Sequence, residues 1–342
     1  MRFSLPQAWS PIGLDIGTQR VNAVQLDALG RVRAYAAFAR REPEADLTIV
    51  EAARIRNVLD RHGFRGCSTV IAAPRHLVRE TILDLPPASS GAPIAQLAVA
   101  ELGRIHKLAP GSFSMGMWEL PASSRSSGGC QTMAVTCPSS ASEELCDVLE
   151  SAGIEPVAID TAGCALVRAL PVDPLGTQAV LELAESRTTL LVIHQGILVF
   201  ERPLSELTMR LLRSRLAKAL RVSVQEAGRL LAERGLLKAD ENLAMIETLR
   251  PLIDPLVEEV AQSGAYASSR YTDAAISQVF LVGRGASVPG LAEYLGESLE
   301  CDFVAPCLSE LAPMRGAMAE RAAAGEGLIA LGLARWRAEV AS

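Results

Sequence analysis

The spacing of apolar positions in the first part of the chain alternates between strand-like and helix-like periods. An apolar run over 12–16 ends in a glycine turn, and alternation over 21–26 and 32–38 predicts two further strands. Apolar residues then recur at helical spacing over 48–62, and short runs over 69–73 and 79–85 predict two more strands. This order predicts a compact unit of mixed helices and strands.

The next stretch, 86–156, has a different pattern of apolar and polar residues. Its pattern predicts, in order, a helix at 94–106, a strand at 113–120, a polar loop at 122–129, a strand at 131–137 and a helix at 142–152. The segment 154–160 then leads to a core helix at 162–170, and Pro171 with Pro174 marks a boundary. We therefore expect a small subdomain inserted into the first unit.

The second half begins as the first does, with three consecutive strands and a turn between the first two. These strands are predicted at 179–184, 188–193 and 197–202, roughly 165 residues after their counterparts, which indicates an internal duplication. The elements that follow are helices at 205–220, 224–234 and about 242–271, a buried strand at 279–282, a glycine turn at 283–286, and helices at 289–299 and 327–337.

Composition narrows the class of protein. The 342 residues include 49% apolar and 21% charged residues, which is typical of a globular chain, and the net charge of −6 gives no basic face for nucleic acid. No apolar run approaches the ~18 residues of a membrane span, and Pro6 and Pro11 interrupt the N-terminus, so we expect no signal peptide and a cytosolic protein. The seven cysteines include no Cys-x-x-Cys pair and are expected to be reduced.

The first turn carries candidate chemistry. Asp15-Ile16-Gly17-Thr18 joins two strands, and such a turn suits a polyphosphate. Gly17 lets the backbone approach phosphate oxygens, the Thr18 hydroxyl can donate to them, and Asp15 can hold a hydrated Mg²⁺. The same four residues also occur in ordinary hairpins, so the turn alone leaves both interpretations open.

Two halves of three strands and a helix, with a late strand and glycine turn, are typical of the actin, sugar-kinase and Hsp70 class of folds. Within that class the chain resembles the PilM family of type IV pilus assembly, an FtsA-like group. The matching stretches are 13–18, 149–160, 225–231 and 279–295. The resemblance implies an α/β, actin-like (ribonuclease H-like) duplicated fold of two lobes with an FtsA-type inserted subdomain.

Mapped onto the chain, this fold predicts four parts. The expected boundaries are 1–85 with 157–172 for the first lobe, 86–156 for the insert, 173–204 with 275–342 for the second lobe, and 205–274 for a helical subdomain of the second lobe.

The resemblance also implies partners. PilM-like proteins use the groove beside the insert for the cytosolic N-terminal tail of a PilN-like inner-membrane protein. We therefore expect a scaffold of a type IV pilus or a related type II secretion machine, at the inner face of that membrane. Self-association and contact with an assembly ATPase are further implied partners. The basic run at 202–221 forms either a solvated helix face or a peripheral contact with anionic lipid.

By the same resemblance, ATP and Mg²⁺ are the implied cofactors. The residues expected to contact them are Asp15 (through water to Mg²⁺), Gly17, Thr18, Gln19, Arg20, Glu182, Thr188, Gly283, Arg284 and Gly285.

Several of these positions depart from the family's nucleotide motifs. Glu182 stands in place of Asp, Ala184 in place of Gly, and Glu185 adds negative charge. Arg284 interrupts the adenosine turn, where it can either stack on adenine or fill the pocket. Asn22 replaces a frequent Lys. We therefore expect at most a weak ATPase, and a degenerate, structural cleft is the rival interpretation.

Two other functions remain as alternatives. A small-molecule kinase on the same fold would need a second phosphate turn, which is not clear in this sequence. An FtsA-like cell-division adaptor would carry a C-terminal amphipathic helix, and the end of the chain is too short for one. Neither a His-Glu-x-x-His metal motif nor a Gly-x-Ser-x-Gly elbow is present.

Overall fold

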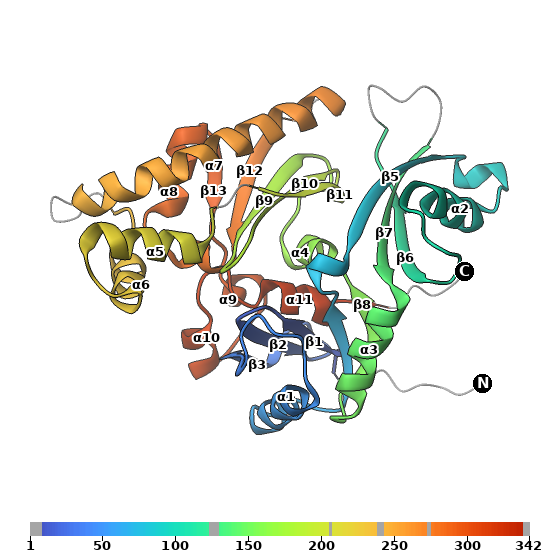
Figure 1. The fold of residues 1–342 in the computed structure, drawn as a ribbon, viewed down its shortest axis with the longest axis horizontal. Helices are drawn as coiled ribbons and strands as arrows, with labels where there is room; N and C mark the ends of the chain where they lie inside the picture. The colour runs from blue at the N-terminus through green and yellow to red at the C-terminus, as the bar shows by residue number, and fades with distance from the viewer. Residues whose placement is uncertain (1–8, 123–129, 205–206, 238–242, 272–274, 338–342) are drawn as a thin grey trace. The chain divides into compact units, whose positions relative to one another are not determined.

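The computed structural model describes residues 9–122, 130–204, 207–237, 243–271 and 275–337 (Figure 1). The predicted loop at 122–129 therefore lies almost wholly outside the described residues. Contacts divide the chain into two units. Unit 1 comprises 1–171, 312–318 and 327–342, and unit 2 comprises 172–311 and 319–326.

Unit 1 is built on a five-stranded sheet with the order β3-β2-β1-β4-β8. Its strands are β1 (Ile12–Ile16), β2 (Arg20–Leu26), β3 (Val32–Ala39), β4 (Ser68–Ala72) and β8 (Glu155–Asp160). The first three strands are antiparallel neighbours, whereas β1, β4 and β8 run parallel. The predicted meander and the buried fourth strand are thus present.

Alternate residues of β1 face different helices. Ile12 and Leu14 pack with the apolar sides of α1 (Ile49–Arg61) and α3 (Ser139–Glu150) in one core. The intervening Gly13 faces α11 (Leu328–Ala334), which also contacts α4 (Ala162–Ala169). A Cβ atom on Gly13 would lie 2.0 Å from the carbonyl oxygen of Ala330. Glycine is therefore what allows α11 to lie against the strand.

The insert within unit 1 has its own sheet, with the order β5-β7-β6. Its strands are β5 (Arg79–Leu85), β6 (Phe113–Glu119) and β7 (Cys130–Pro138), all antiparallel neighbours in that order. Helix α2 (Ile94–His106) covers the face that carries Leu83, Leu85 and Ala134. The short 3₁₀ turns η1 (Arg75–Leu77) and η2 (Ala88–Ser90) flank β5.

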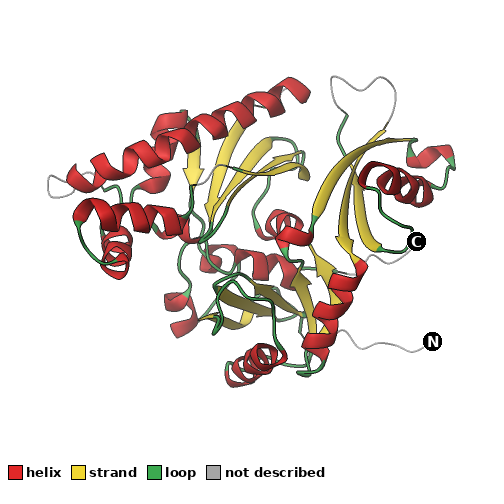
Figure 2. Cartoon of the chain, viewed as in Figure 1, coloured by secondary structure: helices red, strands yellow, loops and turns green. Residues whose placement is uncertain are grey.

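Unit 2 repeats the strand plan of unit 1, with the order β11-β10-β9-β12-β13. Its strands are β9 (Thr177–Leu183), β10 (Thr188–His194), β11 (Ile197–Pro203), β12 (Ile276–Val282) and β13 (Asp302–Val304). As in unit 1, the first three are antiparallel and the other two are parallel. The two matching sheets, shown in yellow in Figure 2, bear out the predicted duplication.

Helices of unit 2 share one large core with the odd-numbered positions of β9. They are α5 (Met209–Leu220), α6 (Val224–Glu233), α7 (Leu243–Arg270) and α8 (Leu291–Leu299). Helix α7 runs without a break through Pro251 and Pro255. The remaining short elements are η4 (Arg284–Ser287) and α9 (Leu308–Leu311) in unit 2, and α10 (Ala317–Arg321), whose residues are divided between the two units in sequence.

The structure differs from the sequence prediction at the C-terminal helix. Residues 275–342 were all expected in the second lobe, but α11 belongs to unit 1. The reason is a close approach that depends on two glycines. Gly13 admits α11 to the sheet, and a Cβ on Gly332 would lie 1.7 Å from the Ala165 carbonyl oxygen of α4. Strands β8 and β13 were also not predicted, because 154–160 and 302–304 show no clear alternation.

Candidate functional site

The first predicted phosphate turn closes tightly between β1 and β2. The Gly17 amide donates to the Arg20 carbonyl at 2.9 Å, and a Cβ on Gly17 would lie 3.1 Å from that oxygen. Across the two strands, the Asn22 side-chain amide donates to an Asp15 carboxylate oxygen at 3.3 Å. One hairpin thus brings together Asp15, Gly17, Thr18, Gln19 and Arg20, with Thr18 exposed at its tip.

A second segment of unit 1 folds back onto this turn. The amides of Arg40 and Glu44 donate to the carbonyls of Gln19 and Thr18, both at 2.8 Å. The Gln19 side chain donates in turn to the Glu44 carboxylate at 3.2 Å. Glu44 has a left-handed backbone with φ of 67°. This contact places a carboxylate beside the turn, a feature that the sequence did not predict.

Buried Glu51 on α1 holds this segment in place. Its side chain is almost completely buried, and both carboxylate oxygens accept from the Arg41 amide at 3.3 Å. Arg54 donates to the same carboxylate at 3.0 Å. A buried charge needs such partners because desolvation is costly. The only hint in the sequence is the position of Glu51, three residues after the N-cap Thr48, in the first turn of a helix.

The equivalent turn of unit 2 closes in the same way as the first. The Ala184 amide donates to the Arg187 carbonyl at 2.9 Å, matching Gly17 and Arg20. Here the N-terminus of α5 completes the turn. The amides of Met209 and Arg210 donate to the carbonyls of Ala184 and Glu185, both at 3.1 Å.

Side-chain hydrogen bonds also stabilise this second turn. Arg213 on α5 donates two hydrogen bonds to the Glu185 carboxylate, one of them 2.9 Å long, and the two side chains are 20% and 12% exposed. The buried Thr188 hydroxyl donates to the Leu207 carbonyl. Glu182 is buried on β9, opposite Thr189. Thr188 and Glu185 are therefore committed to contacts within unit 2.

The predicted adenosine turn follows β12. Gly283 has φ of 75°, and a Cβ there would lie 2.9 Å from the Leu183 carbonyl oxygen. A Cβ on Gly285 would lie 2.6 Å from the Leu183 Cβ. Both glycines are thus required by packing against the end of β9, whatever else they contact. Arg284 is exposed, so its side chain does not fill an interior space of unit 2.

The two turns differ in how well they suit a nucleotide phosphate. The first turn has a glycine, an exposed threonine and a nearby carboxylate, which are groups that suit a phosphate and a hydrated cation. The second turn does not fit, because Glu185 brings a negative charge that is already paired with Arg213, and Ala184 stands in place of the glycine. Among the described residues, no group of three or more His, Cys, Asp or Glu side chains could hold a metal ion.

The insert offers a surface of a different kind. The face of its sheet opposite α2 carries the cross-strand row Ile82, Met133 and Trp118, in which Met133 is buried and the two flanking side chains are half-buried. On the same face Gly116 is exposed, and a Cβ built there would have no heavy atom within 4 Å. An apolar row beside open space can receive an apolar segment of another chain.

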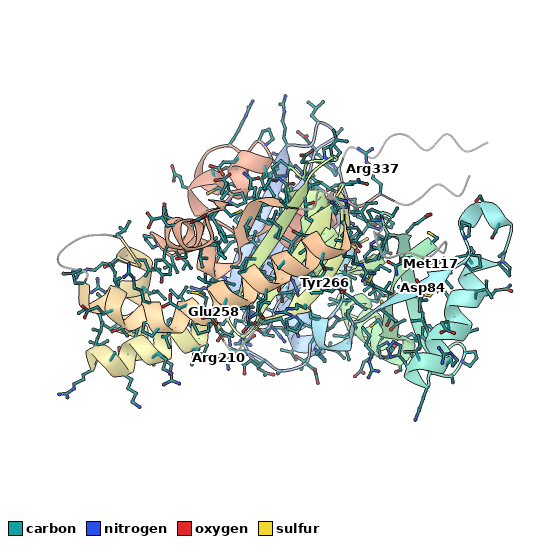
Figure 3. The ribbon with its side chains drawn as sticks, turned by 90° about the horizontal axis from the view of Figure 1, so that it is seen from above. Asp84, Met117, Arg210, Glu258, Tyr266 and Arg337 are labelled. Atoms are coloured by element: carbon teal, nitrogen blue, oxygen red, sulfur yellow. The ribbon has the colours of Figure 1, made fainter. Side chains whose placement is uncertain are left out.

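The predicted basic run is only partly available to a partner. Arg213 is paired with Glu185, and an Arg202 nitrogen lies 3.9 Å from a Glu259 carboxylate oxygen. Arg215, Lys218 and Arg221 are exposed on or just after α5, and Figure 3 labels Arg210 on the same helix. None of the helices within the described ranges is long and apolar enough to span a bilayer.

Comparison with solved structures identifies the fold. The structure of a PilM-PilN type IV pilus biogenesis complex is 19% identical over 95% of this chain and 98% of that chain, with a TM-score of 0.75. The ethanolamine utilization protein EutJ from Carboxydothermus hydrogenoformans is 17% identical, with coverages of 96% and 90% and a TM-score of 0.58. MreB5 of Spiroplasma citri bound to ADP is 11% identical, with coverages of 87% and 92% and a TM-score of 0.50. The two-lobed actin-like fold predicted from the sequence is thereby confirmed.

Comparison of the sequence itself identifies the family. No curated protein matches the chain. The family model for type IV pilus assembly protein PilM matches residues 115–337, which include the second half of the insert, all of the described unit 2 sheet and α11. The match confirms the resemblance and includes three of the four stretches noted in the sequence, 149–160, 225–231 and 279–295. This chain belongs to the PilM family of type IV pilus assembly proteins and is built on an actin-like fold.

Proposed function

We propose that this protein is a cytoplasmic scaffold of a type IV pilus assembly machine, and that its insert binds the N-terminal tail of a PilN-like inner-membrane protein. Membership of the PilM family supports the assembly role. A solved relative of the same fold was described as a PilM-PilN complex, which supports a PilN-like partner. Binding a membrane-anchored tail would hold the protein at the inner face of the inner membrane.

The observation that carries the tail-binding part of the proposal is the insert face opposite α2. It presents the half-buried side chains of Trp118 and Ile82, on either side of buried Met133, and open space above Gly116 on the same face. Strand β6 is an edge strand of this sheet, so its outer backbone groups can also pair with an extended chain. Apolar side chains of a tail would pack on the row while its backbone followed the edge.

A nucleotide has a limited part in this proposal. Asp15, Gly17 and Thr18 are the residues that would contact its phosphates and, through water, Mg²⁺, with Gln19 and Arg20 completing the turn. The ADP bound to the related MreB5 supports nucleotide binding by this fold. Because the second turn does not fit a phosphate, we propose that scaffold function does not require ATP turnover. Self-association and contact with an assembly ATPase remain part of the proposal as further interactions of the scaffold.

The test is fluorescence anisotropy with a labelled peptide of the PilN-like tail. Gly116→Leu directs a side chain into the open space, since no heavy atom lies within 4 Å of a Cβ built there. We expect saturable binding to the unmodified protein and at least ~10-fold weaker binding to Gly116→Leu, equivalent to about 1.4 kcal/mol. Met117→Ala is the matched control, because Met117 (labelled in Figure 3) lies on the same strand, is 37% exposed and pairs with Ala134 on the α2 side of the sheet.

The outcomes separate the parts of the proposal. Weakened binding in Gly116→Leu with unchanged binding in Met117→Ala supports the insert face. Equal binding to all three proteins would mean that the tail binds elsewhere. Absence of binding to the unmodified protein would contradict the scaffold function itself.

A further inference from the structure

We propose that the Glu185 carboxylate takes the place of a bound phosphate at the turn between β9 and β10. Its partner there is the Arg213 guanidinium. This goes beyond the proposed tail binding, because it concerns unit 2 and the response of the protein to polyphosphates. The chemistry involved is an exchange of one anionic partner of Arg213 for another, with no covalent step.

The internal duplication supplies the comparison that supports this assignment. Both turns close with the same backbone bond, from Gly17 to Arg20 and from Ala184 to Arg187, at 2.9 Å in each. At the next position the two turns differ. The first has the exposed Thr18, whereas the second has Glu185, whose side chain is 12% exposed. A hydroxyl that could donate to a phosphate is thus replaced by a carboxylate that carries a negative charge of its own.

Arg213 is positioned to hold an anion at this turn. Its guanidinium donates two hydrogen bonds to the Glu185 carboxylate, the geometry that guanidinium groups form with both carboxylates and phosphates. The side chain is itself 20% exposed, so water screens the pair only in part. A second anion at the turn would meet both the Glu185 charge and a cation that is already paired.

The helix behind Arg213 is shaped to admit it. A Cβ atom on Gly228 of α6 would lie 2.9 Å from the Arg213 Cδ atom. Any larger residue at 228 would therefore push the arginine stem away from its present position. Gly228 has no side chain, and this leaves the space that the Arg213 stem occupies. The conformation of Arg213 therefore depends on the packing of α6.

Backbone contacts hold the same turn against the segment before and within α5. The amides of Met209 and Arg210 donate to the turn carbonyls, and the Thr188 hydroxyl donates to the Leu207 carbonyl. These bonds join the turn to α5, and the Glu185–Arg213 pair adds a side-chain contact between the same two elements. Contacts within unit 2 therefore hold its second turn in place.

The test measures binding of inorganic tripolyphosphate and of Mg-ATP by thermal shift in four proteins. Glu185→Thr gives the second turn the residue that the first turn has at Thr18. We expect it to bind tripolyphosphate at least ~10-fold more tightly than the unmodified protein, and the double change Glu185→Thr with Arg213→Met to lose that gain. Glu226→Gln is the control, because it removes an exposed carboxylate that pairs with Arg229 on α6.

Each outcome decides the proposal. It is overturned if the unmodified protein binds tripolyphosphate as tightly as Glu185→Thr, or if the gain survives the loss of Arg213. Circular dichroism checks that the variants fold. If Glu185→Thr does not fold, the isosteric Glu185→Gln takes its place under the same criteria. Tail-peptide binding should be unchanged in all folded variants, so failure here is distinguishable from failure of the scaffold proposal.

Discussion

Replacing Gly332 by alanine tests how unit 1 is held together. Gly332 lies where α11 crosses α4, and a Cβ there would be 1.7 Å from the Ala165 carbonyl oxygen and 2.4 Å from its carbonyl carbon. The same crossing is bridged by Arg168, whose Nε donates to the Gly332 carbonyl at 3.1 Å, and by Arg335, which donates to the Ala169 carbonyl at 2.9 Å.

The magnitude follows from the displacement that an added methyl group requires. An ordinary C···O contact is ~3.3 Å, so the two helices have to separate by roughly 1.5 Å, and both contacting groups belong to the backbone. Overpacking of this kind costs about 3 kcal/mol. Alanine regains about 1 kcal/mol of helix propensity relative to glycine. We therefore expect Gly332→Ala to lower the free energy of unfolding by about 2 kcal/mol.

The assay is urea unfolding followed by circular dichroism, with Gly264→Ala on α7 as the matched control. A Cβ on Gly264 would lie 3.3 Å from the Cδ1 of Ile276, the flexible end of a side chain. The control gains the same helix propensity with little crowding, and we expect it to be neutral or slightly stabilising. Equal stability of Gly332→Ala and the unmodified protein would refute the close crossing of α4 and α11.

Two further predictions concern titrating groups. Burial lowers the pKa of His194, so the unfolded chain binds the proton more readily than the folded chain. The free energy of unfolding should therefore fall as the pH drops below about 6.5. Urea unfolding across this pH range should show a smaller fall in His194→Gln. Burial, followed by the hydrogen bond to Glu119, raises the pKa of Cys130 to about 11. Near pH ~8.5, where a free thiol is half ionised, Cys130 should react with iodoacetamide more slowly than free cysteine, and faster in Glu119→Gln, as mass spectrometry of the alkylated peptides would show. A steeper fall in His194→Gln, or a rate unaffected by Glu119→Gln, would contradict these assignments.

The elements with a strong period were predictable from the sequence, and so was their duplication. The strand pairs around Gly17 and Ala184 are short, largely apolar runs interrupted by polar turn residues, and this pattern is enough to locate both turns. The position of α11 was not predictable. It depends on Gly13 and Gly332, two residues without side chains whose contact partners are more than 150 positions distant or on another helix. Local periodicity carries no information about such contacts.

The sequence predicts which residues belong to the candidate site, but not the contacts that these residues make. Glu185 was recognised as an unfavourable charge for a phosphate, yet its pairing with Arg213 became visible only with α5 in place. Glu44 was missed because its contact with Gln19 spans 25 residues and depends on a left-handed backbone. Arg284 was expected either to stack on adenine or to fill the pocket, and its exposure in unit 2 argues against filling. The roles of these residues toward a nucleotide remain predictions.

Amide hydrogen exchange with and without the tail peptide shows whether the insert receives a partner tail. If it does, exchange slows in the insert sheet, most of all along edge strand β6 (Phe113–Glu119), with little change in α5. Protection confined to unit 2, with the insert unchanged at saturating peptide, would mean that the insert is not the binding surface.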